Sequence, residues 1–156
     1  MIVLKKNWKT LLFCIGLPLA VGGLSALLSM DAMKEFSQVK QPPLSPPSWL
    51  FPVAWTILYT LMGLAAYFVQ TSGKEVRSAM TVYYVQLAAN FIWPLLFFVG
   101  KWYLLSFFWL LLLWVLVLNT LLLFRRISRT AGNLLIPYLL WLTFAAYLNL
   151  GVAYLN

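Results

Sequence analysis

Long apolar runs separated by short polar segments dominate the sequence. Five stretches lack any charged side chain, and they cover residues 10–30, 49–72, 79–100, 102–124 and 134–156. A run of this length predicts a transmembrane helix, because about 20 helical residues cross a hydrocarbon layer about 30 Å thick. Segments such as FFWLLLLWVLVL lack the alternation of a barrel strand. The pattern therefore predicts an all-α membrane protein, with residues 1–156 forming a single domain built as a five-transmembrane-helix bundle.

One connection is much longer than the others and lies between the first two apolar runs, over residues 31–48. It carries four prolines close together: Pro42, Pro43, Pro46 and Pro47. Proline fixes φ and disfavours helix in the residue before it, so this segment should be extended and stiff. Loops of this length in compact proteins are usually functional or disordered. The prolines favour order, and we predict a long ordered first loop that acts as a lid.

Polar side chains follow a single face of the third apolar run. Gln86 and Asn90 share steps of three and four residues with Tyr83, Trp93 and Phe97, which places all of them on one stripe of a helix. An amide inside a bilayer is costly unless it faces protein, water or a ligand. The stripe is therefore explained by hydrogen bonds between helices or by contacts with a ligand, and the two explanations are compatible.

Aromatic faces also mark the second and last runs. Trp55 and Tyr59 are four residues apart and lie on one helix face, as do Trp141 and the small residue Ala145. A small residue among aromatic ones is explained by packing or by the wall of a pocket. Each of the two runs therefore carries aromatic rings on one helix face.

The first and fourth runs carry weaker signals. Gly22 and Ala26 form a pair of small residues four positions apart, which allows close approach of another helix of the same molecule or of a second copy. The fourth run is rich in Leu, Trp and Phe, and Asn119 is its single amide. We expect this run to be a lipid-facing scaffold.

Charge adds an orientation to this picture. Hydrophobic residues make up 63% of the chain and charged residues 9%, with a net charge of +8. With five spans, the side of the membrane that holds the N-terminus receives eight cationic residues: Lys5, Lys6, Lys9, Lys74, Arg77, Arg125, Arg126 and Arg129. The opposite side receives three: Lys34, Lys40 and Lys101. Short cytoplasmic loops are enriched in Lys and Arg. We therefore predict a multi-pass protein of the cell membrane with a cytoplasmic N-terminus, the C-terminus and first loop on the opposite side, and no nucleic-acid partner.

The residue inventory excludes several kinds of chemistry. The sequence has no histidine and a single cysteine, Cys14, and its three carboxylates, Asp31, Glu35 and Glu75, all fall between the apolar runs. Such a set provides no metal site, no histidine-ligated haem, no internal disulfide and no ordinary acid–base pair within the membrane. We expect no cofactor. The lysine-rich start resembles a signal peptide, but the apolar run that follows is longer than usual and lacks a clear cleavage site, so we expect a retained helix.

Three blocks of residues resemble those of a known family. The first block follows PPLSPP and comprises Trp49, Phe51, Pro52, Trp55, Leu58, Tyr59, Met62 and Gly63. The second block is Gln86, Leu87, Asn90, Trp93, Phe97 and Phe98, and the third is Pro137, Tyr138, Trp141, Phe144, Ala145, Leu148 and Asn149. In order and spacing these blocks are similar to the TspO/MBR family of translocator or tryptophan-rich sensory proteins, over nearly the whole chain. One departure is Leu44, where many members have tryptophan.

The resemblance implies a membrane protein, often a homodimer, with a ligand pocket under the first loop. Members bind porphyrins, eukaryotic relatives bind cholesterol and benzodiazepine-type ligands, and some bacterial members are reported to degrade protoporphyrin in light. The implied function is that of a receptor which senses or handles porphyrin or a similar hydrophobic molecule. The alternatives are a light-dependent porphyrin-degrading enzyme and a transporter of porphyrin or other small amphiphiles.

The resemblance and the aromatic faces together give a set of expected site residues. The expected ligand-binding residues are Pro42, Pro43, Trp49, Phe51, Trp55, Tyr59, Gln86, Asn90, Trp93, Trp141, Phe144, Ala145 and Leu148. Trp55 and Trp141 are also the candidate catalytic residues if the protein is an enzyme. Indole and phenol rings stack on a flat ligand at offset geometry, and a few amides can provide polar contacts.

Overall fold

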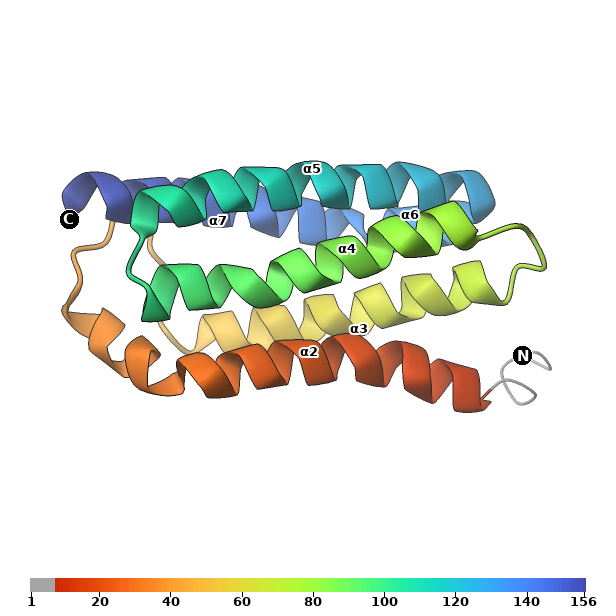
Figure 1. Ribbon diagram of the computed structural model, residues 1–156, viewed down its shortest axis with the longest axis horizontal. Coiled ribbons are helices and arrows are strands. Elements are labelled where there is room, and N and C mark those ends of the chain that lie inside the picture. The colour runs from red at the N-terminus through yellow and green to blue at the C-terminus, as the bar shows by residue number, and fades with distance from the viewer. Residues whose placement is uncertain (1–7) are drawn as a thin grey trace.

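The computed structural model describes residues 8–156, and its regular elements in that range are all helical. The long helices are α2 (Trp8–Glu35), α3 (Leu50–Gln70), α4 (Arg77–Pro94), α5 (Tyr103–Ile127) and α7 (Ile136–Leu155). Shorter elements are the 3-10 turn η1 (Phe36–Gln38), the π-helical turn η2 (Leu95–Val99) and α6 (Arg129–Leu134). The helices run side by side along one axis, with the first loop and the C-terminus together at one end (Figure 1). We call this the loop end.

Within residues 8–156, five segments are long and apolar enough to cross a membrane: Trp8–Gln38, Leu50–Gln70, Arg77–Val99, Tyr103–Ile127 and Arg129–Leu155. The predicted fold class, an all-α five-helix membrane bundle with a long first loop, is confirmed. The first helix runs beyond residue 30, and the last one is interrupted at Leu135 between α6 and α7. The extension of α2 carries exposed charged side chains, among them Asp31 and Glu35, and such side chains are compatible with a helix end that lies beyond the hydrocarbon layer.

Helices α2 and α3 touch through their backbones. A Cβ atom added to Gly63 would lie 2.5 Å from the Cα of Ile15 and 2.6 Å from the carbonyl oxygen of Cys14. Small residues at a membrane helix interface permit this approach. In the predicted small pair of α2, Gly22 is buried inside the bundle and Ala26 is exposed.

The expectation that the fourth run is a lipid-facing scaffold is wrong for one of its faces. That face of α5 is buried against α4 and α7, and it consists of Ser106, Leu110, Leu113, Val117, Thr120, Leu121 and Phe124. Two indoles of α5 also reach its neighbours: Trp109 Nε1–H donates to the Ala89 carbonyl at 2.8 Å, and Trp114 Nε1–H donates to Thr143 Oγ1 at 2.9 Å. Leucine suits lipid and protein surroundings equally well, so a Leu-rich run does not show which way it faces.

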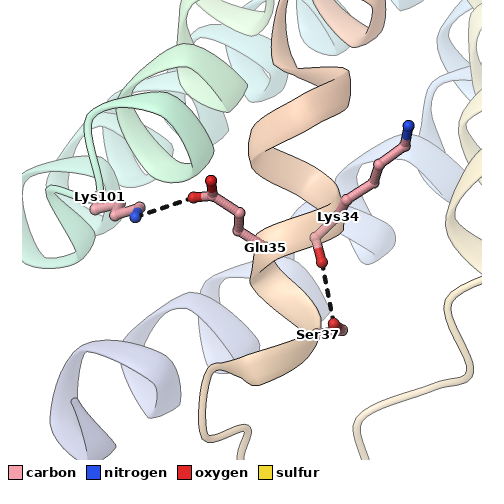
Figure 2. A network of polar contacts seen from close by, with 4 residues as sticks. All are labelled: Lys34, Glu35, Ser37 and Lys101. Atoms are coloured by element: carbon pink, nitrogen blue, oxygen red, sulfur yellow. Dashed lines mark hydrogen bonds and ion pairs between the residues drawn. The ribbon is translucent and has the colours of Figure 1, made fainter.

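The first loop begins at the end of α2, where it is fastened to the segment that precedes α5. Lys101 Nζ lies 3.2 Å from Glu35 Oε2, and Ser37 Oγ–H donates to the Lys34 carbonyl at 3.0 Å (Figure 2). Both charged side chains are more than half exposed, and an exposed ion pair contributes at most about 1 kcal/mol. The ion pair therefore contributes little to the stability of the fold.

The first half of the loop is anchored on the C-terminal part of α7. The Asn156 side chain bonds both backbone groups of Lys40, with Nδ2 to the carbonyl at 2.9 Å and Oδ1 to the amide at 3.3 Å. Tyr147 O–H donates to the Pro43 carbonyl at 2.6 Å, and Pro42 lies against Gly151 so closely that a Cβ there would come within 2.5 Å of the proline ring. These hydrogen bonds and packing contacts hold the first loop in the ordered arrangement that the sequence predicts.

Candidate functional site

Trp55, Trp141 and the rings in direct contact with them form a set of six aromatic side chains from α3 and α7, which we call the central cluster. Its members are Phe51, Trp55, Tyr59, Tyr138, Trp141 and Phe144. At its edge, Phe144 also stacks on Tyr147 with ring centroids 6.3 Å apart. Trp55 stacks on Tyr59 with ring centroids 5.4 Å apart and meets Trp141 edge-on at 6.4 Å. Such offset and edge-to-face pairs are each worth about 0.5–1.5 kcal/mol beyond the area they bury.

A chain of buried hydrogen bonds fixes the two tyrosines of this cluster to α4. Tyr59 O–H donates to Asn90 Oδ1 at 2.7 Å, and Asn90 Nδ2–H donates to the Tyr138 hydroxyl at 2.7 Å. Tyr138 O–H in turn donates to Gln86 Oε1 at 2.9 Å, and Gln86 Nε2 lies 4.0 Å from Met62 Sδ. The amide stripe of the third run therefore makes hydrogen bonds between helices, one of the two explanations that the sequence left open.

Tyr138 was not among the expected site residues, although it holds a central place in this network. It accepts one hydrogen bond and donates another, and its ring meets Trp55 at 6.2 Å. The available signal was its position three residues before Trp141 on the same face of the last helix. A tyrosine hydroxyl inside the bilayer requires a hydrogen-bond partner, as the amides of the third run do.

An open apolar groove of about 460 Å³ runs beside the central cluster between α3 and α7. Its lining consists of Ala54, Ile57, Leu58, Pro137, Leu140, Trp141 and Phe144, none of them charged. Trp141 Nε1 is buried and has no hydrogen-bond partner among the described residues. A buried N–H left unpaired costs about 1–3 kcal/mol. Aromatic walls, an apolar groove and one free donor are typical of a small-molecule site.

Trp93, another expected site residue, lies in a second group of rings, which we call the loop-end cluster. Its members are Phe36, Trp93, Phe97, Phe98 and Tyr103. Trp93 stacks on Phe97 at 5.0 Å and donates from Nε1 to Asn149 Oδ1 at 3.0 Å, while Asn149 Nδ2 donates to the Tyr103 carbonyl at 2.8 Å. A cavity of about 60 Å³ beside this cluster has room for water but not for a porphyrin.

The remaining expected residues take three different positions. Pro42 and Pro43 contact α7, as described above, and Ala145 is buried while Leu148 is partly buried. Trp49 is 66% exposed and contributes no ring to either cluster. Leu44, the position at which many members of the family carry tryptophan, is 82% exposed. The structure thus brings Phe51, Trp55, Tyr59, Trp141 and Phe144 together. Asn90 is hydrogen-bonded to Tyr59 directly, and Gln86 is joined to the group through Tyr138.

Comparison with known proteins gives a consistent result. The sequence model of the TspO/MBR family matches residues 14–155. The chain is 38% identical to the "Tryptophan-rich protein TspO" of Chlorobaculum tepidum over 98% of this chain and 99% of that protein. It is 37% identical to the "Tryptophan-rich sensory protein" of Cereibacter sphaeroides, over 94% and 89%, and 35% identical to the "Translocator protein" of Ovis aries, over 76% and 73%.

Proposed function

The chain belongs to the TspO/MBR family, and we propose that its central cluster and adjoining groove bind a porphyrin or a similarly flat hydrophobic molecule. The protein would act as a membrane receptor that senses or handles this ligand. The observation that carries the proposal is Trp141, which lines a groove of about 460 Å³ and whose buried indole N–H has no partner among the described residues. Pockets for ligands of drug size are commonly 300–1,000 Å³, largely apolar, with few polar groups.

The same lining limits how such a ligand would lie. No charged side chain of the described residues lines the groove, and a carboxylate buried without a partner is strongly disfavoured. The apolar face of a porphyrin would therefore lie against Trp141, which Trp55 supports by its ring contact, and its carboxylates would remain near the membrane surface. Gln86 and Asn90 would act through the tyrosines that they hold, since their oxygens are already engaged.

The test is a protoporphyrin titration of the purified protein in detergent, followed in the dark by quenching of tryptophan fluorescence. Trp55→Phe and Trp141→Phe should each weaken saturable binding about tenfold, the loss expected for one good aromatic or hydrogen-bond contact. Trp102→Phe is the matched control, because Trp102 is 59% exposed at the start of α5 and belongs to neither cluster. Quenching that does not saturate, or that is identical in all four proteins, would contradict the proposal.

A second candidate function is light-dependent degradation of the bound porphyrin with dioxygen as the oxidant. The observation that favours it is the contact between Trp55 and Trp141, whose ring centroids are 6.4 Å apart at the proposed ligand site. Illumination of the same titrated samples tests it. A new pigment product in wild type that is absent in both tryptophan variants supports an enzyme, and unchanged pigment in all samples leaves the receptor function.

Orientation and assembly are further parts of the proposal. Lys9, Lys74, Arg77, Arg125, Arg126 and Arg129 lie at the end of the bundle away from the loop end, whereas Lys34, Lys40 and Lys101 lie at the loop end. Lys5 and Lys6 fall outside the described residues. The asymmetry supports a cytoplasmic position for the cation-rich end, which labelling of single introduced cysteines in sealed vesicles would test. The homodimer rests on the resemblance, and the mass of the detergent-solubilised protein would test it.

A further inference from the structure

Helix α2 adds no ring to the central cluster, yet it determines where one of those rings can lie. A Cβ atom at Gly22 would overlap Cε2 of Tyr59 and would lie 2.5 Å from its Cζ and 2.7 Å from its Cδ2. The ring edge of Tyr59 therefore occupies the space in which any other residue at position 22 would place its side chain. No real Cβ atom tolerates distances this short, so a substitution at Gly22 forces something to move.

The backbone of α2 is poorly placed to yield. Three residues beyond Gly22, Ser25 Oγ–H donates to the Phe91 carbonyl at 2.9 Å and ties α2 to α4. Two turns before Gly22, the backbone at Cys14 and Ile15 lies directly on Gly63 of α3. Because α2 is held on both sides of Gly22, an added methyl group should displace the Tyr59 ring instead.

Tyr59 has few directions in which to move. Its hydroxyl is bonded to Asn90 at 2.7 Å and its ring stacks on Trp55 at 5.4 Å. Displacement of the ring would disturb its stack on Trp55, and Trp55 in turn contacts Trp141, which lines the groove. We propose that Gly22 is a specificity-determining position: its missing side chain gives Tyr59 the place from which it supports Trp55, and this sets the arrangement of Trp55 and Trp141 that a flat, four-ring macrocycle requires. This inference rests on the proposed function and names the size of ligand that the site admits.

The chain supplies matched controls on the same helix. Gly16 and Gly23 are both exposed, and no atom of the described part of the chain would lie within 4 Å of a Cβ added at either position. Alanine at either position improves helix propensity as alanine at position 22 does, but without meeting another side chain. Any effect specific to Gly22→Ala therefore arises from the contact with Tyr59.

The experiment compares Gly22→Ala with Gly23→Ala in titrations with protoporphyrin and with a two-ring aromatic probe, quinoline. One methyl group changes the affinity of an apolar pocket by about 10-fold or more. We expect Gly22→Ala to lose about that factor for protoporphyrin and much less for quinoline, and Gly23→Ala to match wild type for both. Equal losses for the two ligands, or no loss for either, would overturn the inference.

A second pair of variants separates specificity from folding. Tyr59→Ala removes the ring atoms that an added Cβ at position 22 would meet, so Gly22→Ala should have no further effect on protoporphyrin affinity in that background. If the alanine still weakens binding there, Gly22 acts by another route and the inference fails. If wild type itself shows no saturable protoporphyrin binding, the proposed function has failed, which is a different outcome.

Discussion

The central and loop-end clusters are built from the same kinds of side chain but differ in how completely their polar groups are paired. In the loop-end cluster, the Trp93 indole is bonded to Asn149, which is bonded to Tyr103. In the central cluster both tyrosines are bonded, but the Trp141 indole N–H is buried without a partner among the described residues, and Trp141 lines the open groove. The two clusters are thus alike in aromatic composition, and the proposed ligand site is the one that contains the unpaired group.

The largest expected contrast between the clusters comes from truncating one ring in each. Phe97 is 3% exposed and touches Phe36, Trp93, Phe98 and Tyr103. Phe97→Ala should lower the free energy of unfolding by about 3 kcal/mol, because it leaves a cavity that the ring filled. Among molecules that remain folded, protoporphyrin affinity should match wild type. Denaturation in mixed micelles and fluorescence titration measure the two quantities.

The reverse result is expected for Phe144→Ala in the central cluster. Phe144 is only partly buried and lines the groove, so detergent or lipid can fill the space that its ring leaves. The free energy of unfolding should fall by about 1 kcal/mol or less, while protoporphyrin affinity falls severalfold. If Phe97→Ala and Phe144→Ala lowered the free energy of unfolding equally, the two clusters would contribute alike to stability, and the proposed division into a packing cluster and a binding cluster would be wrong.

Sequence patterns predicted much of this arrangement because the bilayer imposes strong rules. Span number followed from uncharged length, and the stripe of Gln86 and Asn90 followed from the cost of an unpaired amide. The sequence did not separate Trp93 from Trp55 and Trp141, since helical spacing fixes a face but not the neighbour that packs against it. Nor could it show that Gly22 receives a ring edge, because a glycine makes room equally for a side chain, a backbone or a second molecule.

A smaller difference in stability is expected when each of two tryptophans, Trp93 with a hydrogen-bonded indole and Trp141 with an unbonded one, is replaced by phenylalanine. Trp93→Phe and Trp141→Phe remove the same atoms, so the difference between them reports on the N–H group. Trp93→Phe leaves Asn149 Oδ1 without its donor and should cost about 1 kcal/mol more unfolding free energy than Trp141→Phe. Only Trp141→Phe should weaken protoporphyrin binding. Chemical denaturation of both variants in one detergent measures the difference, and a larger stability loss for Trp141→Phe would contradict the assignment of the free donor.

The smallest expected effect concerns the two halves of the first loop. The half that includes Pro42 and Pro43 is fixed on α7, whereas the half that leads to α3 exposes Leu44 and Trp49. Tyr147→Phe removes the 2.6 Å bond to the Pro43 carbonyl, which at an exposed site is worth about 0.5–1 kcal/mol.

Global stability of Tyr147→Phe should therefore change little, but the loop should open more often, since local openings depend on the few contacts that oppose them. Hydrogen exchange of amides in residues 36–50 should become about two- to fivefold faster, as a free energy of that size predicts, with amides of α3 unaffected. Tyr154→Phe is the control, because Tyr154 is 88% exposed near the same end of α7. If the two variants exchange equally fast, the bond to Pro43 does not hold the loop, and the anchoring rests on Asn156 and the packing of Pro42 against Gly151.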